Sequence, residues 1–184
     1  MSENKRLEKV NNRIIELIAE NMKAYGVPAT IGRVLGTVYY NRKPMTLDEL
    51  SEKIGMSKTR ISQVVREMID YNIAERVFEK GARKDLYDVE QDYYQTFIFL
   101  FTSNWRKTAL RNRQSEHKFM DELNEIINDE AADPEEREKA EELFEECQIC
   151  LDFYDWLDRL VNFFESGEVF KSVPKTETLK EEKE

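Results

Sequence analysis

Short polar side chains and cations share one side of a helix predicted over residues 58–71. Hydroxyl, amide and guanidinium groups on such a face can hydrogen-bond base edges and phosphates in a DNA major groove. Thr59, Ser62, Gln63 and Arg66 form this side, Lys58 and Arg60 flank it, and Ser57 precedes the helix as its cap; all seven are candidates for DNA binding. The acidic residues Glu67 and Asp70 come only near the end of the helix, whereas recognition helices insert their N-terminal turns. An ordinary solvated helix face is the alternative interpretation of this pattern.

A second group of cations surrounds one glycine in the stretch EKGARKD, residues 79–85. The cations are Lys80, Arg83 and Lys84, and Gly81 supplies the turn between two alternating segments, 74–78 and 85–89. A basic hairpin tip suits a phosphate backbone or a minor groove. Together, the polar helix face and this basic tip favour DNA binding over an ordinary solvated helix face.

The chain as a whole is acidic, with a net charge of −10 over 184 residues. Residues 1–113 carry 20 Lys/Arg and 15 Asp/Glu, a net of +5, whereas residues 114–184 carry 8 and 23, a net of −15. The acidity therefore belongs to the C-terminal part, and it does not exclude a nucleic-acid surface on the first part.

Local signals predict the elements that position these groups. Thr46 and Glu49 form a capping box for a short helix, Gly55 ends that helix, and Ser57 caps the next. Two short helices joined by a glycine turn are typical of a helix-turn-helix, and the hairpin that follows makes it a winged helix. Two more helices precede it, at 4–25 and 29–40, and Gly32 and Gly36 on the second allow another backbone to approach closely.

The rest of the chain is predicted to be helical, over 93–113, 116–128 and from Asp133 as N-cap to about Ser166. The expected fold is mainly α with a small β-hairpin wing, a winged helix-turn-helix domain plus long helices that form a dimerisation domain. The expected domains are 1–92 for DNA binding, 93–171 for dimerisation and effector binding, and 172–184 as a polar, disordered tail.

The last predicted helix has two apolar seams with spacings of three and four, each resembling a coiled-coil seam. One seam contains Leu143, Cys147, Cys150, Tyr154, Leu157, Val161 and Phe164. The other contains Ile149, Phe153, Trp156, Leu160 and Phe163. Two seams require two packing partners, and a second subunit is one candidate. A twofold dimer would place two recognition helices one DNA turn apart on a palindrome.

Few residues could support metal, redox or enzyme chemistry. Cys147 and Cys150 are too few for a disulfide framework, and with His117 they do not make four zinc ligands. Both cysteines fall in the middle of a helix, whereas a redox C-x-x-C usually opens one. His117 has no evident nucleophile partner, so neither an enzyme nor a cofactor is expected. The sequence contains no transmembrane stretch and no signal core, which predicts a cytoplasmic protein.

Four stretches resemble the GbsR-like branch of the MarR winged-helix regulators: YGVPATIGRVLGTVYY, MTLDELSEKIGMSKTRISQVVREM, VFEKGARKDLY and RLVNFFESGEVF. The resemblance covers nearly the whole chain, most closely 25–110 and 155–170. It implies a dimeric repressor that controls uptake of choline and glycine betaine, or synthesis of glycine betaine from choline, in osmotic stress. It also implies that choline or a related quaternary ammonium is a possible effector.

A quaternary ammonium cannot donate a hydrogen bond, so its recognition needs several electron-rich ring faces. The aromatic candidates for such a cage are Tyr39, Tyr40, Tyr94, Phe101, Trp105, Tyr154 and Trp156. For each ring taken singly, a place in the core is the alternative.

The leading hypothesis is thus a dimeric repressor on a palindromic DNA operator, with a small ligand at the junction of the two domains. The alternative is a winged-helix scaffold that binds proteins and shows no steep salt dependence of DNA affinity.

Overall fold

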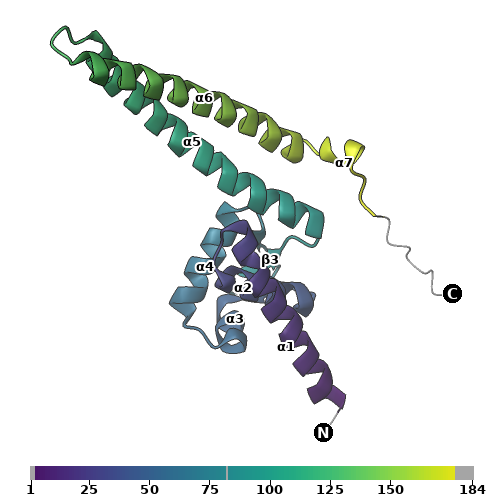
Figure 1. Cartoon of the computed structure of the whole chain (residues 1–184). Coiled ribbons are helices and arrows are strands. Elements are labelled where there is room, and N and C mark those ends of the chain that lie inside the picture. Colours follow the sequence, from purple (N-terminus) through teal and green to yellow (C-terminus); the bar gives the residue numbers. More distant parts are fainter. Residues whose placement is uncertain (1–2, 82, 177–184) are drawn as a thin grey trace. The chain divides into compact units, whose positions relative to one another are not determined.

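The computed structural model describes residues 3–81 and 83–176, and the chain forms two compact units, Met1–Phe101 and Thr102–Glu184. The described residues are mainly helical, with one small antiparallel sheet, which confirms the predicted fold class (Figure 1).

The first unit begins with two crossing helices, α1 (Glu3–Asn21) and α2 (Ala29–Asn41). A short 3-10 helix, η1 (Met22–Tyr25), follows α1 and ends at Gly26, whose φ of 71° is left-handed. Gly32 on α2 faces α1 so closely that a Cβ there would lie 2.5 Å from the Cα of Ala19. The predicted close backbone approach is confirmed at Gly32.

The helix-turn-helix consists of α3 (Leu47–Ile54) and α4 (Lys58–Asp70). The predicted capping box between Thr46 and Glu49 is present, Gly55 has a φ of 75°, and the Ser57 hydroxyl accepts a hydrogen bond from the Arg60 amide. Both helices bury apolar side chains in one core with α2. The largest fully buried members are Ile31, Val34, Val38, Leu50, Ile61, Val64, Met68, Ile73 and Leu100.

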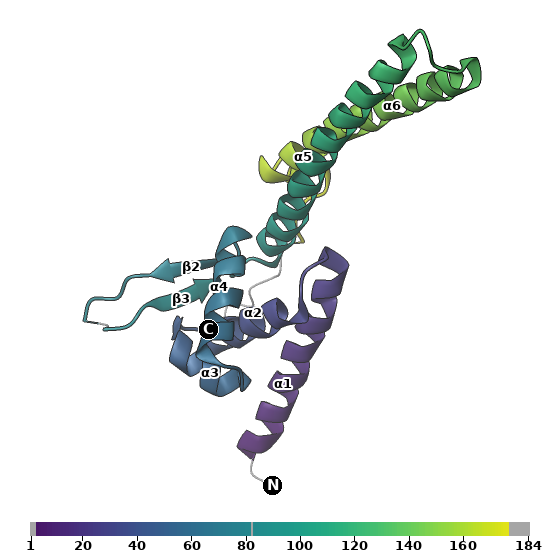
Figure 2. The ribbon, with the colours of Figure 1, turned by 90° about the vertical axis from the view of Figure 1, so that its left-hand side faces the viewer.

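A three-stranded sheet completes the first unit, in the order β1-β3-β2. The hairpin strands β2 (Ala74–Val77) and β3 (Leu86–Val89) pair antiparallel, and Figure 2 shows the hairpin extending beyond α3 and α4. The third strand, β1 (Met45–Thr46), was not predicted. It has only two residues and is defined by its pairing with β3, which local sequence does not reveal.

Two long helices dominate the second unit, α5 (Tyr93–Asn128), which begins in the first unit, and α6 (Pro134–Glu165). They run side by side (Figures 1 and 2) and are joined by hydrogen bonds from Arg106 to Glu165 and from Arg113 to Asp158. The prediction of separate helices at 93–113 and 116–128 was wrong. No glycine or proline interrupts this stretch, and the Ser115 hydroxyl donates to the Arg111 carbonyl within the helix.

The end of α6 matches the prediction, since the helix ends at Glu165 and Gly167 has a φ of 75°. A single helical turn, α7 (Val169–Ser172), follows. Most of the predicted tail, residues 177–184, lies outside the described residues, as does Ala82 of the hairpin tip. The predicted domain boundaries stay a prediction.

Candidate nucleic-acid interface

The core side of α4 determines which of its side chains face outward. Ile61, Val64, Val65 and Met68 are buried, at the helical spacing predicted, and Ile69 lies at the edge of this face with 37% of its surface exposed. The seven candidates at positions 57–66 are exposed, except Arg60 and Ser62, which are half-buried. The predicted polar face therefore stands clear of the core of its own unit.

Hydrogen bonds between neighbours arrange the side chains on this face. An Arg66 guanidinium nitrogen donates to the Ser62 hydroxyl at 3.2 Å, one turn earlier. An Arg60 guanidinium nitrogen donates to the Gln63 side-chain oxygen at 3.4 Å. Because these pairs lie at the surface of the unit, they break at little cost, and their polar groups can turn to another partner.

Asp48, on the first turn of α3, connects α4 to the hairpin. One carboxylate oxygen lies 2.7 Å from Nζ of Lys58, and the other lies 2.6 Å from Nζ of Lys84. The two lysines lower the pKa of the Asp48 carboxyl to about 2. Asp48 was not among the predicted site residues, since nothing in the sequence indicates that positions 48, 58 and 84 meet.

The hairpin places Lys80 and Arg83 at an exposed tip, on either side of Gly81 with its φ of 96°. Phe78 on the same hairpin is 94% exposed, although the sequence pattern treated it as a strand residue. Phe78 thus adds an apolar side chain to a cationic tip, a combination that suits contact with sugars or a minor groove.

The aromatic candidates divide between the two units. In the first unit, the rings of Tyr39 and Tyr40 lie 5.1 Å apart, and Tyr39 lies 5.0 Å from Tyr93. The Arg42 guanidinium lies 4.7 Å from the centre of the Tyr39 ring. Tyr93 was not predicted to belong to this cluster. Burial and hydrogen bonds with Tyr40 and Tyr39 raise the pKa of its phenol.

Two further candidates of the first unit, Tyr94 and Phe101, are on α5. Tyr94 is 41% exposed, and the Phe101 ring stacks on Phe97 at 5.9 Å. Phe97 also contacts the edge of Tyr25, with the ring centres 6.1 Å apart. Phe101 therefore belongs to an aromatic cluster with Phe97 and Tyr25 within the first unit.

The remaining candidates, Trp105, Tyr154 and Trp156, belong to the second unit. The Tyr154 hydroxyl accepts a hydrogen bond from the Asn112 side chain at 3.0 Å, which ties α6 to α5. Trp156 is 48% exposed, and its ring stacks on Phe153 at 5.9 Å. The seven candidates are thus parts of several clusters rather than one cage within a unit.

The two cysteines lie on the packed side of α6, where Cys147 is buried and Cys150 half-buried. Burial, with a hydrogen bond to Glu116, raises the pKa of the Cys147 thiol to about 11. A protonated thiol is a poor nucleophile and a poor metal ligand. Across residues 3–81 and 83–176, no three or more His, Cys, Asp or Glu side chains group as metal ligands would, and no helix could span a membrane.

Comparison with known proteins gives close relatives along nearly the whole chain. Over 170 residues, the chain is 59% identical to the HTH-type transcriptional repressor OpcR of Bacillus subtilis (strain 168), covering 92% of each protein. It is 31% identical over 168 residues to the HTH-type transcriptional repressor GbsR of the same organism, covering 91% of this chain and 93% of that protein. Residues 93–171 match the C-terminal helical hairpin of the GbsR family of transcriptional regulators.

A solved crystal structure of a transcriptional regulator has the same fold. It matches with a TM-score of 0.58 and 14% sequence identity, over 85% of this chain and 98% of that chain. At this identity, the likeness concerns the fold alone.

Proposed function

The chain belongs to the GbsR family of transcriptional regulators, and from this premise we propose that it is a dimeric repressor on a palindromic DNA operator. Membership also means that the chain is a regulator and not an enzyme. The dimer, the palindromic operator and the effector are parts of this proposal.

One observation supports the proposal that α4 and the hairpin bind DNA together. The exposed polar face of α4 and the cationic hairpin belong to the same unit and are joined through Asp48. Arg66, Gln63 and Thr59 would lie toward base edges, and Lys80 and Arg83 toward phosphates. Base contacts would set the sequence preference, whereas phosphate contacts would supply most of the affinity.

The second unit supports a dimer. On α6, Leu157 and Val161 of one seam are buried within their own unit, whereas Ile149, Phe153 and Trp156 of the other seam are 60%, 48% and 48% exposed. Large side chains exposed in a row are typical of a protein interface. A second copy of the same helix is the partner that we propose for this seam.

The operator can be found by selecting fragments of the host genome that bind the purified full-length protein. We expect enrichment of a few sites with inverted repeats whose half-sites are about one helical turn apart. The genes beside these sites are proposed to serve uptake or synthesis of glycine betaine and choline. Recovery of no specific site would contradict the repressor proposal, and enrichment of unrelated genes would contradict only the osmoprotectant part.

The tyrosine cluster around Arg42 supports a cation as effector. The Arg42 guanidinium already lies over the Tyr39 ring, with the Tyr40 ring centre 6.0 Å away. Choline or a related quaternary ammonium would compete with Arg42 for these ring faces. Such a ligand changes DNA affinity only if it binds the DNA-bound and free conformations unequally.

Calorimetric titration of the protein with choline tests this effector proposal. We expect saturable binding that Tyr39→Leu abolishes and Tyr154→Leu, which changes a candidate in the second unit, leaves intact. If Tyr154→Leu alone abolishes binding, the cage includes the second unit instead. If titration of the unsubstituted protein with choline gives no heat of binding, the proposal of a quaternary ammonium effector is wrong.

A further inference from the structure

Phe78, where the hairpin leaves β2, is an apolar side chain that the fold does not bury. Of the large apolar side chains in the described residues it is the most exposed, at 94%, ahead of Leu7 at 70%. It is the first residue beyond the last pair of the hairpin ladder, Val77 with Leu86. Because single exposed apolar side chains are common on proteins, what Phe78 can bind is decided by the charges around it.

The hairpin around this ring is cationic. Residues 76–85 contain four Lys/Arg and two Asp/Glu, a net charge of +2. Arg76 is paired with Asp85 across the hairpin, so the carboxylate nearest the tip on the returning strand is neutralised. Lys80 and Arg83 form no ion pair with any of the described residues. The ring therefore lies among cations that can bind an anionic partner.

A hollow of about 400 Å³ lies beside the ring on the hairpin. Phe78 forms part of its wall, and Arg83 and Lys84 also line it. A sugar–phosphate strand of DNA has the matching chemistry, because its sugars offer apolar edges and its phosphates are anionic. The hollow can thus hold the backbone while the ring reaches the bases.

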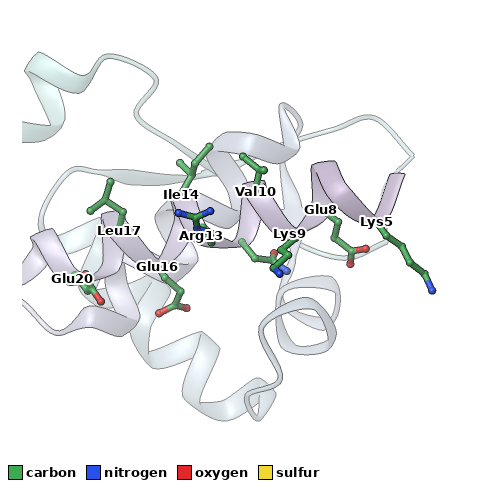
Figure 3. A pocket seen from close by; sticks show the side chains of 10 residues that line it. Lys5, Glu8, Lys9, Val10, Arg13, Ile14, Glu16, Leu17 and Glu20 are labelled. Carbon is green, nitrogen blue, oxygen red and sulfur yellow. The ribbon is translucent and has the colours of Figure 1, made fainter. Parts of the chain in front are cut away.

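The exposed apolar side chains of α1 have different surroundings. Val10 and Leu17 lie along one edge of that helix, and Figure 3 shows both cations and carboxylates beside them, among them Arg13 and Glu16. Charges of both signs do not select an anionic partner, whereas the net positive hairpin does. Phe78 is therefore the exposed apolar side chain whose surroundings best indicate DNA.

We propose that Phe78 inserts between two base pairs from the minor groove and partly unstacks that step. This inference rests on the proposed repressor function, since it concerns the same DNA complex. Lys80 and Arg83 bind the phosphates beside the inserted ring. An apolar side chain that enters the minor groove next to arginine and lysine is the combination with which proteins kink DNA.

The insertion makes Phe78 a specificity residue that forms no hydrogen bond to a base. With α4 in the major groove, the hairpin reaches the adjoining minor groove about five base pairs away, half a helical turn. Pyrimidine–purine steps, TA and CA/TG, unstack most easily. Each half-site of the operator should therefore carry such a step at this distance from the α4 contact.

Fluorescence of 2-aminopurine tests the insertion, with the full-length protein bound to an operator fragment recovered by genomic selection. Adenines are replaced by 2-aminopurine one at a time across a half-site, because this base becomes brighter when it is unstacked. Protection of guanine N7 from methylation locates the α4 contact in the major groove. We expect the fluorescence to rise at one step, about five base pairs from that contact, and circularly permuted fragments to show a bend there.

Two substitutions on the hairpin separate insertion from phosphate contact. Phe78→Ser should lose the fluorescence rise and the bend in the saturated complex, with an unchanged log–log salt slope, because it removes no cation. Lys80→Ala is the matched control and should lower the slope by about one while the rise persists. Phe78→Leu keeps an apolar side chain and should retain the bend. Circular dichroism checks that each variant keeps its fold.

A change in the DNA provides an independent test of the same contact. Replacing the unstacked pyrimidine–purine step by an A-tract step should weaken binding of the unsubstituted protein by about fivefold or more. The same replacement should hardly affect Phe78→Ser, since this variant has no ring to insert.

Two outcomes would overturn the insertion and leave the repressor proposal standing. One is specific operator binding without a fluorescence rise at any position. The other is a rise that persists in Phe78→Ser, which would assign the unstacking to another group. Recovery of no specific DNA fragment would instead contradict the repressor proposal itself, and the insertion with it.

Discussion

Asp48 holds the two lysines that connect α4 to the hairpin, in the manner in which a DNA phosphate would hold them. Its pKa of about 2 is below the ordinary value, so the pairing is present above about pH 4 and is lost as the pH falls through about 2. In the physiological range, Asp48 is therefore ionised, and at the proposed interface DNA would compete with it for Lys58 and Lys84.

Asp48→Asn should increase DNA affinity. Both lysines become available to phosphates and one repulsive charge disappears, so affinity should rise several-fold and fall more steeply with salt, by up to about two in the log–log slope. Glu52→Gln, the same change in net charge on the same helix, is the control and should have a smaller effect. Fluorescence anisotropy of labelled operator at several salt concentrations measures both quantities. Unchanged or weaker binding by Asp48→Asn would mean that Asp48 positions the lysines rather than competing for them.

Cys147 is expected to be chemically inert. Its thiol has a pKa of about 11 because it is buried, so its thiolate fraction at pH 7.5 is on the order of a hundredfold below that of an ordinary cysteine. In a Cys150→Ala variant, alkylation by iodoacetamide should be slower than in a model thiol by at least that factor. The rate should still be rising above pH 9. Rapid alkylation at pH 7.5 would revive a redox role for this residue.

The crossing of α1 and α2 depends on one glycine. An alanine at position 32 would place its Cβ 2.5 Å from the Cα of Ala19 and 2.9 Å from its nitrogen, both backbone atoms that cannot rotate away. Gly32→Ala should therefore lower the free energy of unfolding by about 1–3 kcal/mol, despite the better helix propensity of alanine.

Gly36→Ala is the matched control, because the nearest atoms to its Cβ are side-chain carbons of Ile15 at 3.3 and 3.4 Å. That variant should be neutral or slightly stabilised. Urea denaturation followed by circular dichroism compares the two. Equal stabilities would mean that α1 adjusts its position freely on α2.

The elements that the sequence predicted well are those with local signals. The Thr46–Glu49 capping box, the Gly55 turn and the Asp133 cap are all present, since each depends on residues within a few positions. The missed strand depends on residues far away in the sequence, and the wrongly divided helix lacks any residue that would end it. The strand β1 exists only through β3, and the division of α5 had no helix-breaking residue to support it.

For the candidate site, the sequence predicted which side of a helix faces outward, but not which residues far apart in the sequence come into contact. The outward side of α4 follows from helical periodicity, and the structure places it as predicted. The positions of Asp48 and Tyr93 among their partners follow from tertiary packing, which single-sequence patterns do not contain. Several helices of both units supply the seven aromatic candidates, and a cage formed among them stays a prediction.

At the scale of the whole molecule, the α6 seam is the proposed main link between two copies. Trp156→Glu places a charge within the exposed row of Ile149, Phe153 and Trp156 and should weaken the dimer by about thirtyfold or more. Leu110→Glu, at an apolar side chain of α5 that is 56% exposed, is the matched control and should leave the dimer intact. Sedimentation velocity over a range of concentrations measures both. A dimer unaffected by Trp156→Glu would mean that α6 does not form the interface.

The most direct test of the central claim measures operator affinity against salt for the double variant Arg66→Ala/Arg83→Ala. One change removes a cation from α4 and the other removes a cation from the hairpin, while Arg159→Ala on α6 of the second unit serves as control. If both cations contact phosphates or bases, affinity should fall at least about tenfold, and the log–log salt slope should decrease by about two. Unchanged affinity and slope in the double variant would contradict DNA binding by α4 and the hairpin.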